Sequence, residues 1–396
     1  MRLPVRTIGC LFTAIALTCS VSAQTDTKKA PGVTNIQILI GSCSALDGPA
    51  GFLGRQTIVG ATTYLNSINA EGGVYGRKIQ LLAFDDGYEP EKAESCFKRL
   101  LKEGIFSAGF FVGTPTAAKY VPMAEASGVP VVGLFTGAEL LYTPLKRHVL
   151  NVRASYYDET REQVENLWNV LGIRRIGVIY QDDAFGQAVL SGLEIALKKH
   201  NAAPTGLGTF PRNTLDVDRG IAAVRAQNPR AVLLVGPYAP VAEIIKKAHA
   251  NGWYPLFFTV SFVGTEKLIT EAGKDAEGVI ITQVVPPYSR TDFPAVAQYR
   301  NALKTFYPAE QPNFVSLEGY VDAMVLVEGL RRAGKDLTRE KLITALESIQ
   351  NKDLGLGPRL ILKYSATRHK GFDQIYTTVV RNGRPEIVED WKKLGK

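Results

Sequence analysis

The sequence predicts an α/β protein made of two doubly wound parallel-sheet units in tandem. Apolar runs of strand length alternate with amphipathic helical stripes, a pattern typical of a parallel sheet with helices on both faces. The alternation breaks at the polar stretch 151–160 and restarts near residue 175. With 396 residues, 45% of them hydrophobic, the chain is long enough to bury two cores. Two units of similar length therefore follow one another.

The first unit is predicted from apolar runs separated by helices. The helix after the first run places Ala61, Leu65 and Ile68 on one face, the spacing of an amphipathic helix. The predicted strands are 36–41, 78–84, 106–112 and 129–135, with further helices from about Pro90 and after Thr114.

The second unit repeats this order. A helix is expected from about Phe185, and another over 241–250. The predicted strands are 175–180, 230–236, 256–259 and 278–284.

The rest of the chain changes character at 283–290. Pro286 and Pro287 cannot continue a central strand, so this stretch is a connector. A turn is expected at Asn382-Gly383. The segments expected beyond the connector are helices at 294–306, 315–333 and 338–348, and strands at 359–364 and 374–383.

The stretch GTPTAAKYVP, residues 113–122, follows a predicted strand and starts a helix. We expect Thr114 to be the N-cap, with its hydroxyl accepting a hydrogen bond from an N–H one turn on. Pro115 then occupies the first helical position. The other N–H groups of the first turn stay free to bind an acceptor outside the helix.

Residues 1–23 predict a secretory signal peptide. Arg2 and Arg6 give a basic start, 8–17 is apolar, and a small-residue cleavage site ends at Ala23. We expect cleavage there and an exported, soluble protein; a lipoprotein processed at Cys19 is the alternative. No later apolar run reaches membrane-spanning length.

The charge pattern argues against a nucleic-acid partner. The formal net charge is +8, spread along the chain without basic blocks, whereas nucleic-acid binding requires basic residues clustered on one face.

Two of the four cysteines, Cys43 and Cys96, follow the signal segment. In an oxidising compartment an even pair is a disulfide candidate. Two buried free thiols are the alternative, since a sequence does not show whether the two Cβ atoms meet.

Catalytic and cofactor motifs are missing from the sequence. None of the four histidines lies in a strand-end loop beside a nucleophile, and nucleophile elbows, Walker loops, G-x-G-x-x-G turns and H-E-x-x-H helices are absent. The acid pairs Asp85-Asp86 and Asp182-Asp183 have too few neighbouring ligands for a metal. We therefore expect a protein that is not an enzyme and that holds no metal and no cofactor.

Residues 48–93 resemble the periplasmic leucine/isoleucine/valine-binding protein family, the substrate receptors of ABC transporters. The shared features are Gly48-Pro49, the helix from Gly60 to Tyr64, the turn from Ile68 to Gly76, and Asp85-Asp86. The resemblance extends over about 34 to 390, including Phe185-Gly186.

That resemblance implies a type I periplasmic-binding fold, two lobes joined by a three-strand hinge that close on a ligand. The crossings are expected near 152–155, 284–287 and 373–376. The implied N-terminal lobe is 34–153 plus 286–374, and the C-terminal lobe is 154–285 plus 375–396.

The resemblance also implies a ligand site in the loops that follow the strands. Ligands of open α/β sheets bind beyond the carboxyl ends of the strands. A carboxylate is expected at the helix start, where unsatisfied N–H groups favour an anion. The implied ligand-binding residues are Gly113 and Thr114 for the carboxylate, Phe135, Thr136 and Gly137 for the amino end, and Phe185 and Tyr238 as aromatic walls.

Two positions depart from the family pattern. Ser261 stands where amino-acid-binding members place a glutamate for the ligand ammonium, and Glu266 lies about five residues too late. A desolvated ammonium without an ionic partner is costly. Leu53 stands where the family often has an aromatic residue, which implies a pocket of altered shape.

These features predict a monomeric periplasmic solute-binding protein that delivers a small carboxylate to an ABC transporter permease in the inner membrane. The expected ligand resembles a branched-chain amino acid, an oxo acid or an aromatic acid. A sensory subunit that docks on a membrane receptor is one alternative. An exported α/β enzyme is the other.

Overall fold

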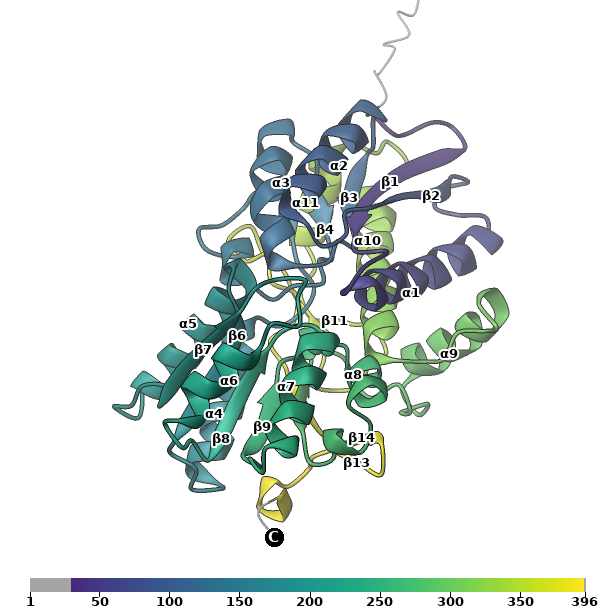
Figure 1. Cartoon of the computed structure of the whole chain (residues 1–396). Helices are drawn as coiled ribbons and strands as arrows, with labels where there is room; N and C mark the ends of the chain where they lie inside the picture. The colour runs from purple at the N-terminus through teal and green to yellow at the C-terminus, as the bar shows by residue number, and fades with distance from the viewer. Residues whose placement is uncertain (1–29, 395–396) are drawn as a thin grey trace, which may run out of the picture.

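The computed structural model describes residues 30–394. The signal peptide expected at residues 1–23, and Cys19 with it, lies outside the described residues. The chain forms two lobes, each with its own sheet covered by helices, which meet along one edge (Figure 1).

The first lobe is built on a five-stranded sheet whose strands are all parallel, in the order β2-β1-β3-β4-β5. β1 and β2 pair in register from Gln37 and Lys78 to Ser44 and Asp85. The strands are β1 (Gln37–Ser44), β2 (Lys78–Asp85), β3 (Ser107–Gly109), β4 (Val131–Val132) and β5 (Val149–Leu150).

Within residues 30–394, six α-helices belong to the first lobe, three from the early part of the chain and three from 294–347. The late helices share a buried apolar cluster with α1 and β1, which includes Ile40, Leu65, Leu317 and Leu330. The six are α1 (Gly51–Ala70), α2 (Pro90–Lys102), α3 (Thr114–Ser127), α9 (Pro294–Phe306), α10 (Phe314–Ala333) and α11 (Arg339–Glu347).

Glycines let α1 and α10 approach closely. A Cβ at Gly60 would lie 1.8 Å from the carbonyl oxygen of Ser316, and one at Gly319 would lie 2.2 Å from that of Thr57. Any larger residue at these positions would force the two helices apart. This contact fixes the late part of the chain to the first lobe.

The second lobe is built on a seven-stranded sheet in the order β14-β13-β10-β9-β8-β6-β7. Strands β6 to β10 are parallel, while β13 pairs antiparallel with β10 and β14 forms a hairpin with β13. The strands are β6 (Ile176–Gln181), β7 (Gly206–Phe210), β8 (Ala231–Val235), β9 (Leu256–Thr259), β10 (Ile280–Gln283), β13 (Tyr376–Arg381) and β14 (Arg384–Ile387).

The helices of the second lobe pack against this sheet around a large buried cluster that includes Leu193, Leu233, Ile244 and Ile280. They are α4 (Tyr156–Asn169), α5 (Ala184–Lys198), α6 (Asp218–Arg225), α7 (Tyr238–Ala250) and α8 (Thr265–Ala272). A short pair, β11 (Lys352–Asp353) with β12 (Ile361–Leu362), lies in the segment between α11 and β13.

The predicted fold class is confirmed, with differences at short elements and at α4, a 14-residue helix that begins inside the stretch 151–160, where the sequence predicted only a break. Strand 106–112 is cut to β3, because Phe110 has a positive φ of 65° and the chain bends there. The prediction passed over β7, where buried glycines alternate with more exposed residues, and over α6, a short helix whose large buried apolar residues are only Ile221 and Val224. The Asn382-Gly383 turn is present, with both residues at positive φ.

The start of α3 also differs from the prediction. Gly113, with φ 105°, is the N-cap, Thr114 is the first helical residue and Pro115 the second. The hydroxyl of Thr114 does not cap its own helix. The prediction was wrong because the glycine makes the turn out of the strand one residue earlier.

Three crossing segments bring the chain from one lobe to the other. Ala154, Val284 and Ile375, one from each segment, form a small buried apolar cluster of their own. The segments therefore lie side by side, as a hinge requires.

Within residues 30–394, no helix is both long and apolar enough to span a bilayer.

Cys43, in β1, and Cys96, in α2, form a disulfide with their Cα atoms 6.1 Å apart. Both residues belong to an apolar cluster between the sheet and helices α2 and α3. The bond ties a strand to the helix that covers it within the first lobe.

We expect the double substitution Cys43→Ala/Cys96→Ala to lower the free energy of unfolding by about 2–4 kcal/mol, because the 53-residue loop is no longer closed in the unfolded chain. Urea denaturation followed by circular dichroism measures this. Free, alkylatable thiols at both positions in non-reduced exported protein would contradict the bond.

Candidate functional site

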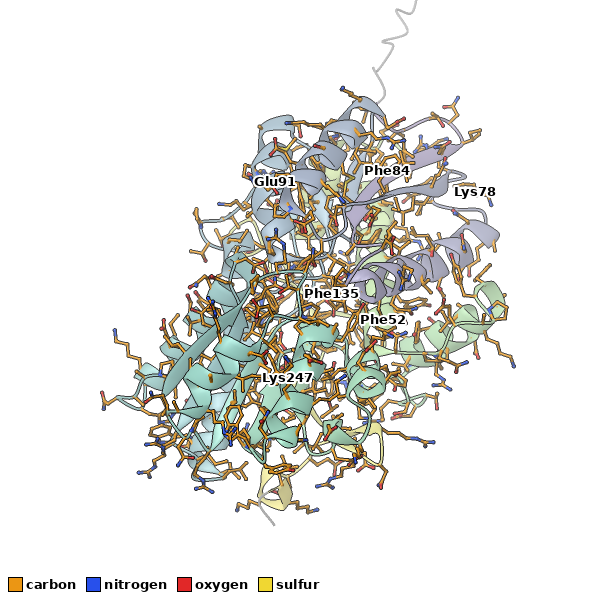
Figure 2. All side chains as sticks on the ribbon, in the orientation of Figure 1. Phe52, Lys78, Phe84, Glu91, Phe135 and Lys247 are labelled. Atoms are coloured by element: carbon orange, nitrogen blue, oxygen red, sulfur yellow. A yellow bond between two sulfur atoms is a disulfide. The ribbon has the colours of Figure 1, made fainter. Side chains whose placement is uncertain are left out.

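The two lobes meet through loops at the carboxyl ends of their strands and the first turns of their helices. Figure 2 labels Phe52 and Phe135 of the first lobe at the level where the lobes meet. Side chains from both lobes share one buried cluster there, among them Leu53, Tyr88 and Phe135 with Phe185 and Phe262. The structure is a closed form of the two-lobed molecule.

Two threonine hydroxyls meet at the start of α3. The Oγ1 atoms of Thr114 and Thr136 are 2.7 Å apart, and both residues are fully buried. The N–H of Gly113 donates to the carbonyl of Phe135 at 3.2 Å, which fastens the two loops together. Since Pro115 has no N–H, the free donors of this first turn belong to Thr114 and Thr116.

Tyr156 adds a third hydroxyl to this place. Its N–H donates to the carbonyl of Gly137 at 2.8 Å, and its hydroxyl lies beside Thr136 and Gly137. That hydroxyl is buried, yet it has no hydrogen bond of normal geometry to any residue in 30–394. Burial raises the pKa of Tyr156 to about 12, so the hydroxyl remains a donor at neutral pH.

We call Thr114, Thr136 and Tyr156 the hydroxyl cluster. Its three hydroxyls come from a helix start, a strand-end loop and the first turn of α4. They gather at the positive end of α3, where anions are favoured. The arrangement is suited to a small anionic group such as a carboxylate.

Phe262 forms an apolar wall beside the hydroxyl cluster. Its ring centre lies 4.4 Å from that of Phe185, 5.6 Å from Phe135 and 6.0 Å from Tyr88. It belongs to the turn after β9 and is fully buried. One residue of the second lobe therefore reaches aromatic rings of the first.

Tyr238 and Leu53 meet at another part of the boundary. The N–H of Phe52 donates to the hydroxyl of Tyr238 at 3.3 Å, and the two rings pack edge to face at 5.9 Å. A Cβ at Gly264 would lie 2.6 Å from Leu53 Cδ2, so glycine makes room for the leucine. The first turn of α1 thus packs on the first turns of α7 and α8.

Ser261 is bonded within the protein. Its N–H donates to Glu159 Oε2 at 2.8 Å, and its hydroxyl donates to Glu159 Oε1 at 2.9 Å. The guanidinium of Arg153 also donates to Ser261 and, at 2.9 Å, to Glu159, while Thr282 donates to the second carboxylate oxygen. Each oxygen of Glu159 accepts two hydrogen bonds, which leaves no lone pair for a ligand ammonium.

Arg153 joins the two lobes through ion pairs with one carboxylate from each. It lies in the first crossing and pairs with Glu159 of α4 and, at 3.0 Å, with Glu318 of α10. Its guanidinium also lies 5.4 Å from the ring centre of Phe135 and 5.6 Å from that of Tyr156. It is 1% exposed.

More carboxylates than cations surround Arg153. Burial, with the charge of Glu159, raises the pKa of Glu318 to about 7 against the opposing effect of Arg153. Burial also raises the pKa of Asp322 well above its ordinary value, and Glu318 adds to that shift. Both shifts favour the protonated form of these two carboxyls.

Glu266 does not replace the missing acid at position 261. Its two carboxylate oxygens are buried. The backbone N–H of Phe314, at the start of α10, and the hydroxyl of Tyr288 lower its pKa. Burial nevertheless raises its pKa to about 7.

The outer edge of the boundary is closed by polar contacts. Glu89 of the first lobe accepts from Arg212 at 2.9 Å and from Asn213 at 2.7 Å. The side chain of Gln181 donates to the hydroxyl of Tyr88 at 3.2 Å. These contacts hold the rims of the two lobes together.

The structure brings six of the implied ligand residues together around the hydroxyl cluster and its aromatic wall. Tyr238 and Leu53 lie apart from these, in the contact between α1 and α7. Ser261 is buried against Glu159. Sequence reasoning missed four residues of this region. Phe262 could have been found from the sequence, because it is an aromatic residue directly after Ser261 beyond a predicted strand, whereas nothing in the local sequence points to the other three. The residues brought together are Gly113, Thr114, Phe135, Thr136, Gly137 and Phe185, and those missed are Arg153, Tyr156, Glu159 and Phe262.

In the part of the chain that the structure describes, no three His, Cys, Asp or Glu side chains gather in a way that would hold a metal ion.

Comparisons with known proteins place both lobes among binding proteins. A family model described as periplasmic binding protein matches residues 37–385. The Leu/Ile/Val-binding protein of Escherichia coli strain K12 is 23% identical over 270 residues, which are 67% of this chain and 72% of that protein.

Solved structures match this chain over a larger share of its length. A possible leucine/isoleucine/valine-binding protein from Rhodopirellula baltica SH 1 is 32% identical, with a TM-score of 0.87, over 92% of this chain and 100% of that one. A substrate-binding periplasmic protein from Ralstonia solanacearum is 28% identical, with a TM-score of 0.81, over 87% and 98%.

We expect Arg153→Met to lower the free energy of unfolding by about 3–5 kcal/mol, because it leaves Glu159 and Glu318 buried without their cation. Arg161→Met is the matched control, since Arg161 is half exposed in its pair with Asp158, and should change stability by about 0.5 kcal/mol or less. Urea denaturation measures both. Equal effects of the two substitutions would contradict the role of Arg153.

We expect Glu266 to make the fold less stable as the pH rises. A carboxyl whose pKa is 4.5 when unfolded and about 7 when folded takes up a proton on folding in that window, so stability falls between about pH 4.5 and pH 7, by up to about 3 kcal/mol. Glu266→Gln should remove this part of the dependence, which denaturation at pH 5 and pH 8 measures.

Glu271→Gln is the control for that measurement, because Glu271 lies on the same helix with its side chain 37% exposed in a pair with Lys267. A stability difference between wild type and Glu266→Gln that is the same at both pH values would rule out the titration of Glu266.

Proposed function

The chain belongs to the periplasmic binding protein family, and on that basis we propose that it is a monomeric periplasmic receptor that passes a small carboxylate to an ABC transporter permease. The lobes proposed are 34–153 plus 286–374 and 154–285 plus 375–396, with the ligand held between them. Signal peptide cleavage after Ala23 belongs to the same proposal.

The observation that carries this proposal is the hydroxyl cluster at the start of α3. Thr114 and Thr136 are in contact, and the buried hydroxyl of Tyr156 beside them has no well-formed bond within residues 30–394. A carboxylate placed there would accept from hydroxyls and from first-turn N–H groups. Because the three hydroxyls come from both lobes, the same anion would hold the molecule closed.

The other end of the ligand would face aromatic rings. Phe135, Phe185 and Phe262 surround this side, and the nearest acid at Ser261, Glu159, has its oxygens fully used. A free ammonium there would lose its hydration without gaining an ionic partner. We therefore propose a carboxylate with an apolar or aromatic body that does not depend on an α-amino group.

The relatives' names give a different expectation for the ligand. Both the Escherichia coli protein and the Rhodopirellula baltica structure are described as binding, or possibly binding, leucine, isoleucine and valine. The distinguishing comparison is therefore between each amino acid and its deaminated analogue.

A thermal-shift assay tests the proposal with the pairs leucine and 4-methyl-2-oxopentanoate, and phenylalanine and phenylpyruvate. A ligand at a hundred times its Kd should stabilise the fold by about 2.7 kcal/mol, a shift of several degrees for a chain of this size. We expect the oxo acids to raise the Tm at least as much as the amino acids, and Thr114→Val to abolish the shift.

Thr63→Val is the matched control, because Thr63 is fully buried and its hydroxyl donates to the carbonyl of Val59 in α1. If only the free amino acids raise the Tm, the argument from Glu159 fails. If Thr114→Val responds as wild type does, the hydroxyl cluster is not the anion site.

A further inference from the structure

A cavity of about 510 Å³ lies against the crossing segments. It is bounded by the connector after β10, by 375–377 at the start of β13, and by the late segment 387–391. None of its lining residues belongs to the hydroxyl cluster or its aromatic wall. Its volume is in the range of small-molecule sites, roughly 300–1,000 Å³.

Arg359 supplies a free cation at this cavity. It lines the cavity and is exposed. Its guanidinium lies 5.2 Å from the ring centre of Tyr376, and among residues 30–394 it has neither an ion pair nor a hydrogen bond to an acid. A guanidinium held on a ring in this way presents its N–H groups for bidentate binding of a carboxylate.

The hydroxyl of Tyr376 supplies a second donor. Tyr376 is 5% exposed, and its oxygen is buried without a hydrogen-bond partner in the described part of the chain. Burial raises its pKa, and Arg359 and Arg290 oppose that shift. Since buried hydroxyls are normally bonded, this one is available to an acceptor that enters the cavity.

The remaining walls define what the acceptor is attached to. Phe293, Trp391 and Ile375 give the cavity apolar surface. Glu162 and Glu389 also line it, and Asn166 donates a hydrogen bond to Glu162 at 3.0 Å. Two carboxylates repel a doubly charged anion such as phosphate more strongly than a singly charged one. The chemistry suits a single negative charge on an apolar body.

We propose that this cavity is a second binding site, separate from the one between the lobes, which takes a small monocarboxylate with an apolar body. The carboxylate pairs with the guanidinium of Arg359 and accepts a hydrogen bond from the hydroxyl of Tyr376. The apolar body packs on Phe293 and Trp391.

Trp391 makes the test specific to this site. The chain has three tryptophans, and the other two, Trp168 and Trp253, do not line the cavity. Cyclohexanecarboxylate is a suitable probe because it has no aromatic ring to absorb in the tryptophan band. We expect a saturable change in tryptophan emission in wild type that is lost in Trp391→Phe.

Substitutions show which side chains bind the carboxylate of the probe. Arg359→Gln should raise the Kd of the probe by about tenfold or more, which is the loss of one charge-assisted pair, and Arg359→Lys should give an intermediate Kd. Arg384→Gln, which removes an exposed arginine of β14 outside the cavity lining, should leave the Kd unchanged. Tyr376→Phe should weaken binding without removing charge.

Thr114→Val distinguishes this site from the one between the lobes. The Kd of the probe, measured from the emission of Trp391, should be the same in that variant as in wild type. The proposal is overturned if the emission does not change, if Arg359→Gln and Tyr376→Phe both bind as wild type does, or if Thr114→Val abolishes the signal. Because Arg359 is exposed, its substitutions should leave the melting curve intact, and Arg359→Lys gives a second reading if Arg359→Gln does not fold.

Discussion

The closed arrangement of the two lobes depends on one buried guanidinium. Arg153 lies where the chain first crosses between the lobes, with Glu318 of the first lobe on one side and Glu159 and Ser261 of the second on the other. A cation this deeply buried is stable only when its partners are fixed in position. The helix that carries each acid is thereby held at a set distance from the crossing.

The candidate ligand site is built on that fixed group. The ring centres of Phe135 and Tyr156 lie 5.4 Å and 5.6 Å from the guanidinium, and Tyr156 and Thr136, the residue after Phe135, belong to the hydroxyl cluster. Ser261, held by Glu159, places the neighbouring Phe262 among the rings of the first lobe. Both oxygens of Glu159 are used by hydrogen bonds inside this group, and the side chains beside it at the boundary are hydroxyls and aromatic rings.

The sequence determined the elements better than the contacts between them. The amphipathic helix α9 and the short apolar strand β9 were predicted at their true bounds, because the hydrophobic pattern along the chain reports burial directly. The N-cap at Gly113 was missed because Thr114 and Pro115 fit the ordinary cap pattern equally well. Tyr156 and Arg153 were missed because their roles depend on partners more than a hundred residues away or in another loop, which no local pattern records.

The threefold crossing of the chain has a consequence for how the protein reaches its native state. Helices α9 to α11 complete the first lobe, and β13 completes the second by pairing with β10, so neither lobe is a continuous stretch of sequence. Both cores therefore require contacts between distant segments, which close slowly. A nascent chain lacking residues 376–387 has no partner for the free edge of β10, so the second lobe can reach its final topology only after nearly the whole chain has been synthesised.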